Sequence, residues 1–146
     1  MFQALEESGL EMVKKILIAD HVEINRIELK NILGDNYEYV EALNGAAAMR
    51  VLREQHESIS LVLLELQLPM VDGYSVLEWI SNQPWHDQIP VLVMADREGD
   101  LSLVDPSYQL GAVDNIMRPF SPINVRNRIH TFVRLYDLLA KAGVYK

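Results

Sequence analysis

Short apolar runs alternate with amphipathic segments along most of the chain. Five runs rich in aliphatic and β-branched side chains predict strands, at 15–19, 37–42, 60–65, 90–95 and 112–117. The runs at 60–65 and 90–95 are almost continuously apolar, which is typical of strands that are covered on both faces. The pattern therefore predicts a parallel sheet that lies between layers of helices.

The segments between these runs carry apolar residues at helical spacing. They predict helices at 21–34, 44–56, 74–81 and about 102–110. In the first helix, Ile24, Ile27 and Leu33 recur at this spacing. A last helix is predicted from Ser121, which can cap it, and Pro122, which suits the first helical position.

Five successive strand–helix units predict an α/β fold of the flavodoxin-like type. We expect a doubly wound, five-stranded parallel sheet of order 2-1-3-4-5 with five helices in a three-layer α/β/α arrangement. The domain is expected to span 14–137. An acidic lead-in at 1–13 precedes it, and a helix extension or the start of a linker follows at 138–146.

Two tryptophans bracket the long connection after the third predicted helix. Trp79 lies within the helical pattern and is expected in the core. Trp85 lies in a polar loop that contains proline, and we expect its side chain to be exposed.

Composition narrows the class of protein. The chain has 146 residues, enough for one domain, with 49% hydrophobic and 23% charged residues and a net charge of -8. This charge argues against nucleic acid or an anionic membrane surface as the partner. The absence of cysteine excludes disulfides and thiol chemistry. No apolar run approaches the roughly 20 residues of a membrane span, and we expect a cytoplasmic protein.

Polar residues follow the predicted strands at the positions where parallel sheets bind ligands. The relevant end of such a sheet is the carboxyl end of its strands. Asp20 and His21 follow the first strand, Glu65 ends the third, Asp96 follows the fourth and Arg118 follows the fifth. A functional site is therefore expected to include these side chains.

The chain resembles the receiver domains of bacterial two-component signalling over residues 14–136. The resemblance rests on five ordered stretches, KILIADHVEINR, EALNGAAAM, LVLLELQLPMVDGYSVL, IPVLVMA and GAVDNIMRPF. It implies a regulatory domain in phosphorelay signal transduction, without enzyme activity of its own.

The resemblance also implies a set of site residues. In the family, an Asp ending the third strand accepts a phosphoryl group, and an acidic pair after the first strand helps to hold a divalent metal. A Thr or Ser ends the fourth strand, a Lys ends the fifth, and an aromatic residue three positions before that Lys reorients on activation. The matching positions here are Glu65, the pair Asp20 and His21, Ala95, Arg118 and Asn115. Only Asp20 keeps the usual chemical form.

These substitutions weaken the family's chemistry. The carboxylate of Glu65 is displaced by about 1.5 Å relative to that of Asp, and misplacement by about 1 Å can cost on the order of 10²-fold in rate. His21 offers nitrogen where Mg²⁺ prefers oxygen, and Ala95 has no hydroxyl. The planar fork of Arg118 suits a carboxylate, so we expect an ion pair with Glu65. That pair would either imitate a phosphoryl contact or merely stabilise the turn.

We therefore expect a pseudo-receiver that is not phosphorylated and that binds Mg²⁺ weakly or not at all. One alternative is a genuine phosphoryl-accepting response regulator with atypical chemistry at Glu65 or His21. Another is a flavodoxin-like small-ligand binder or enzyme. A transition-metal site made of Asp20, His21 and Glu65 is a weaker possibility.

Charge is unevenly distributed between the last two helices. Six of the 13 Lys and Arg residues follow position 117, where Asp137 is the only acid. We expect a self-complementary patch that supports a two-fold homodimer through the fourth helix, fifth strand and fifth helix, a surface the family commonly uses. Its residues would be Asp96, Glu98, Asp100, Asp105, Arg126, Arg128 and Arg134. An attached output domain or another signalling protein is the other expected partner.

Overall fold

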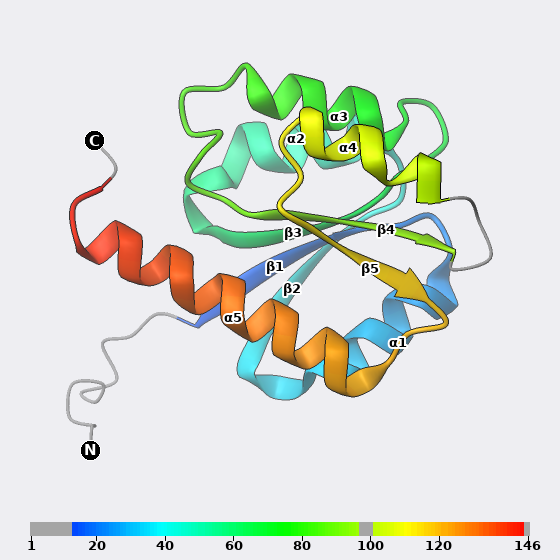
Figure 1. Cartoon of the computed structure of the whole chain (residues 1–146), viewed down its shortest axis with the longest axis horizontal. Helices are drawn as coiled ribbons and strands as arrows, with labels where there is room; N and C mark the ends of the chain where they lie inside the picture. Colours follow the sequence, from blue (N-terminus) through cyan, green and yellow to red (C-terminus); the bar gives the residue numbers. More distant parts are fainter. Residues whose placement is uncertain (1–12, 97–100, 145–146) are drawn as a thin grey trace.

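The computed structural model describes residues 13–96 and 101–144, and within them five parallel strands form one sheet (Figure 1). Their order is β2-β1-β3-β4-β5, which confirms the predicted topology. The strands are β1 (Lys14–Ala19), β2 (Tyr37–Ala42), β3 (Ile59–Glu65), β4 (Val91–Asp96) and β5 (Asp114–Arg118). Because all neighbouring strands are parallel, their carboxyl ends meet at one end of the sheet.

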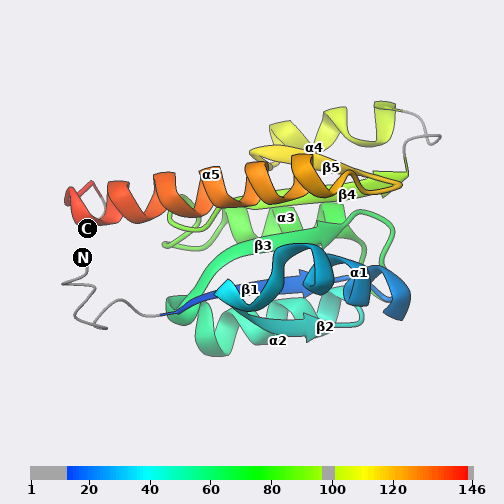
Figure 2. The same ribbon diagram turned by 90° about the horizontal axis from the view of Figure 1, so that it is seen from below.

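Helices cover both faces of this sheet (Figure 2). One face carries α1 (Glu23–Leu33) and α5 (Pro122–Lys141), and the other carries α2 (Gly45–Gln55), α3 (Gly73–Ser81) and α4 (Asp105–Gln109). Short 3-10 turns occupy Gly34–Asn36, His56–Ser58 and Leu101–Leu103. The predicted three-layer arrangement is therefore confirmed. Within the described residues, no helix is both long and apolar enough to cross a membrane.

The pleat of the strands divides the core into two clusters. On β1, Leu17 and Ala19 join the cluster that contains residues of α2 and α3, whereas Ile16 and Ile18 join the cluster under α1 and α5. The central strand β3 is buried at six of its seven positions. A strand that contacts helices on both faces needs such a continuous apolar run.

The side chains that α1 buries are not all those that the apolar pattern of the sequence indicated. Ile24 and Ile27 are 64% and 39% exposed, whereas Arg26 is only 9% exposed. Nε of Arg26 donates to Oε1 of Glu41 at 2.6 Å, and its Nη1 donates to the carbonyl of Asp20 at 2.9 Å. These bonds compensate for burial of the guanidinium, so a charged residue occupies a position that the apolar pattern did not indicate.

Trp85 is buried, so the expectation of an exposed side chain was wrong. Its exposed fraction is 9%, and its ring stacks on that of His56 with 4.6 Å between centroids. Trp79 meets it edge-on at 6.0 Å. The polar loop folds back so that this ring joins the core cluster on the α2 and α3 side.

We predict that the link between α1 and β2 depends on pH. The hydrogen bond from Lys30 and then that from Arg26 hold the pKa of Glu41 below its usual value of 4.5. The resulting stabilisation is complete above pH 4.5 and is lost as pH falls through the lowered folded-state pKa. Glu41→Gln should therefore cost about 1 kcal/mol at pH 7 and less at pH 3, as measured by urea unfolding.

The exposed neighbour Glu38 supplies the control, because Glu38→Gln removes the same charge from the same strand. Equal losses from the two variants at pH 7 would contradict a specific role for Glu41.

Candidate functional site

The carboxyl ends of four strands bring the expected site residues together. Glu65 ends β3 and pairs in register with Met94 of β4. Asp96 ends β4 and pairs in register with Arg118, the last residue of β5. Asp20 directly follows β1 and is fully buried. The apolar strands thus deliver three acids and one base to the same end of the sheet.

Arg118 lies among these three acids. Its Nη2 donates to Oε1 of Glu65, so the expected ion pair is present. Its Nε donates to Oδ1 of Asp96 at 2.8 Å, and Nη1 lies 3.6 Å from Oδ2 of Asp20. Nη1 is buried without a hydrogen bond of its own. One guanidinium therefore faces three carboxylates, with closer contacts to Glu65 and Asp96 than to Asp20.

Glu65 is only 3% exposed, and both of its carboxylate oxygens have partners. Oε2 accepts a hydrogen bond from the backbone N–H of Gln67 at 3.0 Å, and Oε1 accepts from Arg118. Burial raises the pKa of Glu65, while the Gln67 N–H and the Arg118 charge oppose that rise. Burial lowers the pKa of Arg118, but the neighbouring carboxylates of Glu65 and Asp96 outweigh it, so the net shift is upward.

Asp20 is fixed by the turn that follows β1. Its Oδ1 accepts from the backbone N–H of Val22 at 2.9 Å, and its Oδ2 accepts from Nδ2 of Asn25 at 3.1 Å. His21 lies at the rim, because its side chain is 46% exposed and its Nδ1 is 4.0 Å from Oδ1 of Asp20. Asp20 therefore faces the site from a hydrogen-bonded turn, and His21 contributes little to the interior of the site.

Two glycines allow the loop that follows Glu65 to pack closely against the backbone around it. A Cβ on Gly73 would lie 2.6 Å from the carbonyl oxygen of Glu65, and a Cβ on Gly45 would lie 1.9 Å from that of Val71. Asp72 caps α3 by accepting from the N–H of Ser75 at 2.9 Å. The tight packing of this loop sets the direction in which the Glu65 side chain leaves the strand.

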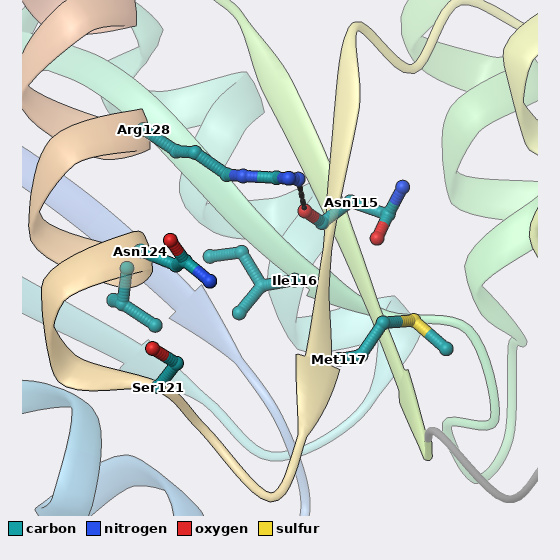
Figure 3. A pocket seen from close by; sticks show the side chains of 7 residues that line it. Asn115, Ile116, Met117, Ser121, Asn124 and Arg128 are labelled. Carbon is teal, nitrogen blue, oxygen red and sulfur yellow. Dashed lines mark hydrogen bonds between the residues drawn. The ribbon is translucent and has the colours of Figure 1, made fainter.

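Polar contacts hold Asn115, the residue at the position that the resemblance assigns to the switch side chain. Nδ2 of Asn115 donates to the hydroxyl of Tyr108 at 2.6 Å, which links β5 to α4. Nη1 of Arg128 on α5 donates to the carbonyl of Asn115 at 2.7 Å (Figure 3). Asn115, Arg128 and Ser121 line a small pocket between β5 and α5. Ala95, at the hydroxyl position, is buried and offers no polar atom from its side chain.

The residues present do not fit the divalent metal that the resemblance implies. Among the described residues, no three His, Asp or Glu side chains are grouped so that they could hold a metal ion. Arg118 already supplies a positive charge beside Asp20, Glu65 and Asp96, and it would repel a second cation. The weaker possibility of a transition-metal site at Asp20, His21 and Glu65 therefore finds no support in this geometry.

Among the described residues, the charged side chains expected in one patch on the last two helices do not lie together. α4 and α5 lie on opposite faces of the sheet, and the edge strand β5 lies between them. Asp96 is paired with Arg118, and Nη1 of Arg128 binds Oδ1 of Asp114 at 3.0 Å. Glu98 and Asp100 lie outside the described residues.

The arginines expected in that patch also divide between two flanks of α5. Arg126 and Arg134 line hollows on the side of β2, away from β5. Arg128, by contrast, contacts β5. Arg126 and Arg128 are two positions apart, and such residues point in very different directions because each residue turns the helix by about 100°. The charge count in the sequence could not show this division.

Comparisons with known proteins agree on one family. A family model described as the response regulator receiver domain matches residues 16–130. The chain is 32% identical over 122 residues to the "Probable transcriptional regulator ycf27" of Cyanophora paradoxa, covering 83% of this chain and 48% of that protein. It is 31% identical over 135 residues to the "Probable cyclic di-GMP phosphodiesterase" of Vibrio cholerae, covering 89% and 30%. The chain thus spans about half or less of these relatives.

Solved structures resemble the fold closely. A response regulator receiver domain protein from Clostridium thermocellum has a TM-score of 0.76 at 22% identity, covering 86% of this chain and 98% of that one. The receiver domain of a signal transduction histidine kinase from Syntrophus aciditrophicus has a TM-score of 0.73 at 26% identity, covering 83% and 90%. At an identity of 22%, the first likeness concerns the fold alone.

We predict that Arg118→Met destabilises the protein by about 3 kcal/mol or more at pH 7, because it leaves Glu65 and Asp20 buried without their cation. In the variant, burial raises the pKa of Glu65 without opposition from Arg118. The loss should therefore shrink as pH falls through that raised pKa and the carboxyl becomes neutral. Urea unfolding at pH 7 and pH 5 measures both effects.

Arg118→Lys is the control, because it keeps the charge and removes the planar fork, and it should cost less than Arg118→Met. If Arg118→Met lowered the free energy of unfolding by the same amount at both pH values, the electrostatic explanation would be contradicted.

Proposed function

Since the chain belongs to the response regulator receiver domain family, we propose that it is a regulatory module of two-component signalling that works without phosphorylation. The observation that carries this proposal is the position of Arg118, whose guanidinium faces Glu65, Asp20 and Asp96. In this reading the arginine replaces both the metal and the lysine of an ordinary receiver site.

The state of Glu65 supports the same conclusion. A carboxylate that accepts a phosphoryl group needs an accessible oxygen placed in line with the donor. Both oxygens of Glu65 are already bonded, and its exposed fraction is 3%. Ala95 cannot replace the hydroxyl that would contact a phosphoryl group. Accepting phosphate would require the Arg118 contact to break without the metal that usually compensates for the charge.

The Glu65–Arg118 pair also reproduces one contact of a phosphorylated receiver, that between an acceptor-bound oxygen and the cation of β5. A permanent pair of this kind would hold the β3–α3 loop and β5 in one arrangement. The domain would then present a constant surface, and its regulation would come from binding rather than from a chemical step.

The proposed partners are a second copy, an attached output domain or another signalling protein. Two relatives are named as a transcriptional regulator and a cyclic di-GMP phosphodiesterase, and this chain spans 48% and 30% of their lengths. We therefore propose that an output domain is attached after α5. The net charge of -8 argues that this domain itself does not contact nucleic acid.

Incubation with acetyl phosphate and Mg²⁺ tests the central proposal. Intact-mass measurement should show no gain of a phosphoryl group by the wild-type chain, since Arg118 and Gln67 occupy the oxygens of Glu65. A stoichiometric gain of one phosphoryl group would favour the alternative, a genuine response regulator with atypical chemistry at Glu65 or His21.

A variant that restores the family pattern is the matched control. His21→Asp, Glu65→Asp, Ala95→Thr and Arg118→Lys together supply the acidic pair, the acceptor, the hydroxyl and the lysine on the same scaffold. This variant should gain one phosphoryl group under conditions in which the wild type gains none. An ordinary receiver domain in the same reaction verifies the reagent.

We also propose that the face formed by α4, the edge strand β5 and α5 contacts a second copy of the chain. Tyr108 on α4 is 40% exposed there and is hydrogen-bonded to Asn115 on β5.

Light scattering at increasing concentration should report a dimer. Tyr108→Glu should weaken the dimer at least tenfold, because it places a charge at the contact. Leu138→Glu, on the other flank of α5, is the control. A monomer at high concentration and low salt would contradict the dimer.

A further inference from the structure

A groove runs along the flank of α5 that faces away from β5. Two adjoining hollows form it, and they share Asn36, Tyr37 and His130. The first extends past Val133 toward Leu138, Arg134 and Lys14, and the second reaches Leu33 and Arg126. The groove therefore combines apolar side chains with a row of basic ones.

The basic row has no acidic partner in the described structure. Arg126, His130 and Arg134 follow one another at i, i+4 and i+8, so they lie along one side of α5. All three are exposed. Among the described residues, the ion pairs include neither Arg126 nor Arg134. Asp137 is the only carboxylate that lines the groove, and it already pairs with Lys14 at 2.7 Å and Lys141 at 3.1 Å.

This chemistry fits an acidic segment that also carries large apolar side chains. The two exposed arginines of this row attract the carboxylates of such a segment. The apolar residues Val133, Tyr37 and Leu138 would bury part of its apolar side chains.

We propose that residues 1–12 of the same chain dock in this groove. Their sequence, MFQALEESGLEM, carries three acids and no Lys, Arg or His, and it includes Phe2, Leu5 and Leu10. The charge of this segment is thus complementary to the basic row, and its apolar residues match the rest of the groove. The docking is independent of phosphorylation at Glu65.

The connection and the spacing are suitable. The segment joins the domain just before Lys14, whose side chain lines one end of the groove. Arg134 and Arg126 are eight residues apart on α5, which corresponds to about 12 Å along the helix. Glu11 and Glu7 are four residues apart, which in an extended chain corresponds to about 13 Å. An extended segment that runs from Lys14 along α5 can therefore place each acid beside one arginine.

Tethering makes this contact effective even when each ion pair is weak. A short tether to the domain gives the segment an effective concentration of about millimolar at the groove.

Paramagnetic relaxation in the chain of 146 residues tests the proposal. The chain has no cysteine, so Ser8→Cys gives a single site for a nitroxide label. The amide signals of Tyr37, His130 and Arg134 should lose most of their intensity relative to the reduced label. Signals of α3, on the opposite face of the sheet, should keep theirs.

Charge reversal separates docking from mere proximity of the tether. In the labelled chain, Glu6→Lys, Glu7→Lys and Glu11→Lys together should restore the groove signals, because the tether length stays the same. A control triple variant, Glu54→Lys, Glu57→Lys and Glu78→Lys, makes the same charge change at exposed sites of α2, α3 and the turn between α2 and β3, and it should leave the loss unchanged. Adding Arg126→Glu and Arg134→Glu to the variant with Lys at positions 6, 7 and 11 should again reduce the intensity of the groove signals, because the charges are then complementary once more.

Two results would overturn the proposal. The first is a loss of groove signals that is equal in the wild-type lead-in and in its charge-reversed form. The second is an equal loss in isotope-labelled chains without nitroxide when they are mixed with nitroxide-labelled chains, since the groove would then take its ligand from a second copy.

Discussion

The guanidinium of Arg118 lies between three carboxylates that the parallel sheet forces to one end, and the arrangement of that end depends on it. Glu65, Asp20 and Asp96 come from three different strands or the turns after them, and each would repel the others without a cation. Burying a carboxylate costs several kcal/mol unless an opposite charge and hydrogen bonds compensate. Arg118 supplies the charge, and the N–H groups of Gln67 and Val22 supply further bonds to Glu65 and Asp20.

In an ordinary receiver this compensation comes from a dissociable metal and is altered by a transient phosphoryl group. Here the cation is part of the polypeptide, so its concentration cannot change. The pairing also extends outward from Arg118. Its Nε binds Asp96 at the end of β4, while three residues earlier Asn115 binds Tyr108 of α4 and accepts a hydrogen bond from Arg128 of α5. The site and the edge of the sheet are therefore connected by fixed polar contacts on a single strand.

The sequence predicted the sheet order and the residues that meet at its carboxyl end, because continuous apolar runs and the right-handed crossover rule leave few alternatives. It also predicted the pairing of Glu65 with Arg118, because both positions follow from strand ends. The contact of Arg118 with Asp96 was not predicted. A side chain that ends one strand can reach several neighbours, and the packing around the guanidinium decides which carboxylates it meets.

Other features depend on contacts between segments that are distant in the chain. Arg26 is buried because Glu41 and the carbonyl of Asp20 bind it, whereas the apolar pattern of α1 pointed to Ile24 and Ile27. Trp85 is buried because its loop folds back onto His56. Composition gives the number of charged or apolar residues in a helix or loop. It does not show which of these side chains contact residues from a distant segment of the chain.

Under the proposed function the pair of Glu65 and Arg118 is permanent, and the free energy for transmitting a signal has to come from binding. A ligand shifts a conformational equilibrium only by the difference in its affinity for the two states. In this chain α5 contacts both candidate surfaces, with Arg128 facing β5 and with Arg126 and Arg134 facing the groove beside β2. Because α5 is one continuous helix of 20 residues, a ligand that displaces it on one flank also changes the other. That coupling would give a receiver fold a regulatory input without any chemical step at Glu65.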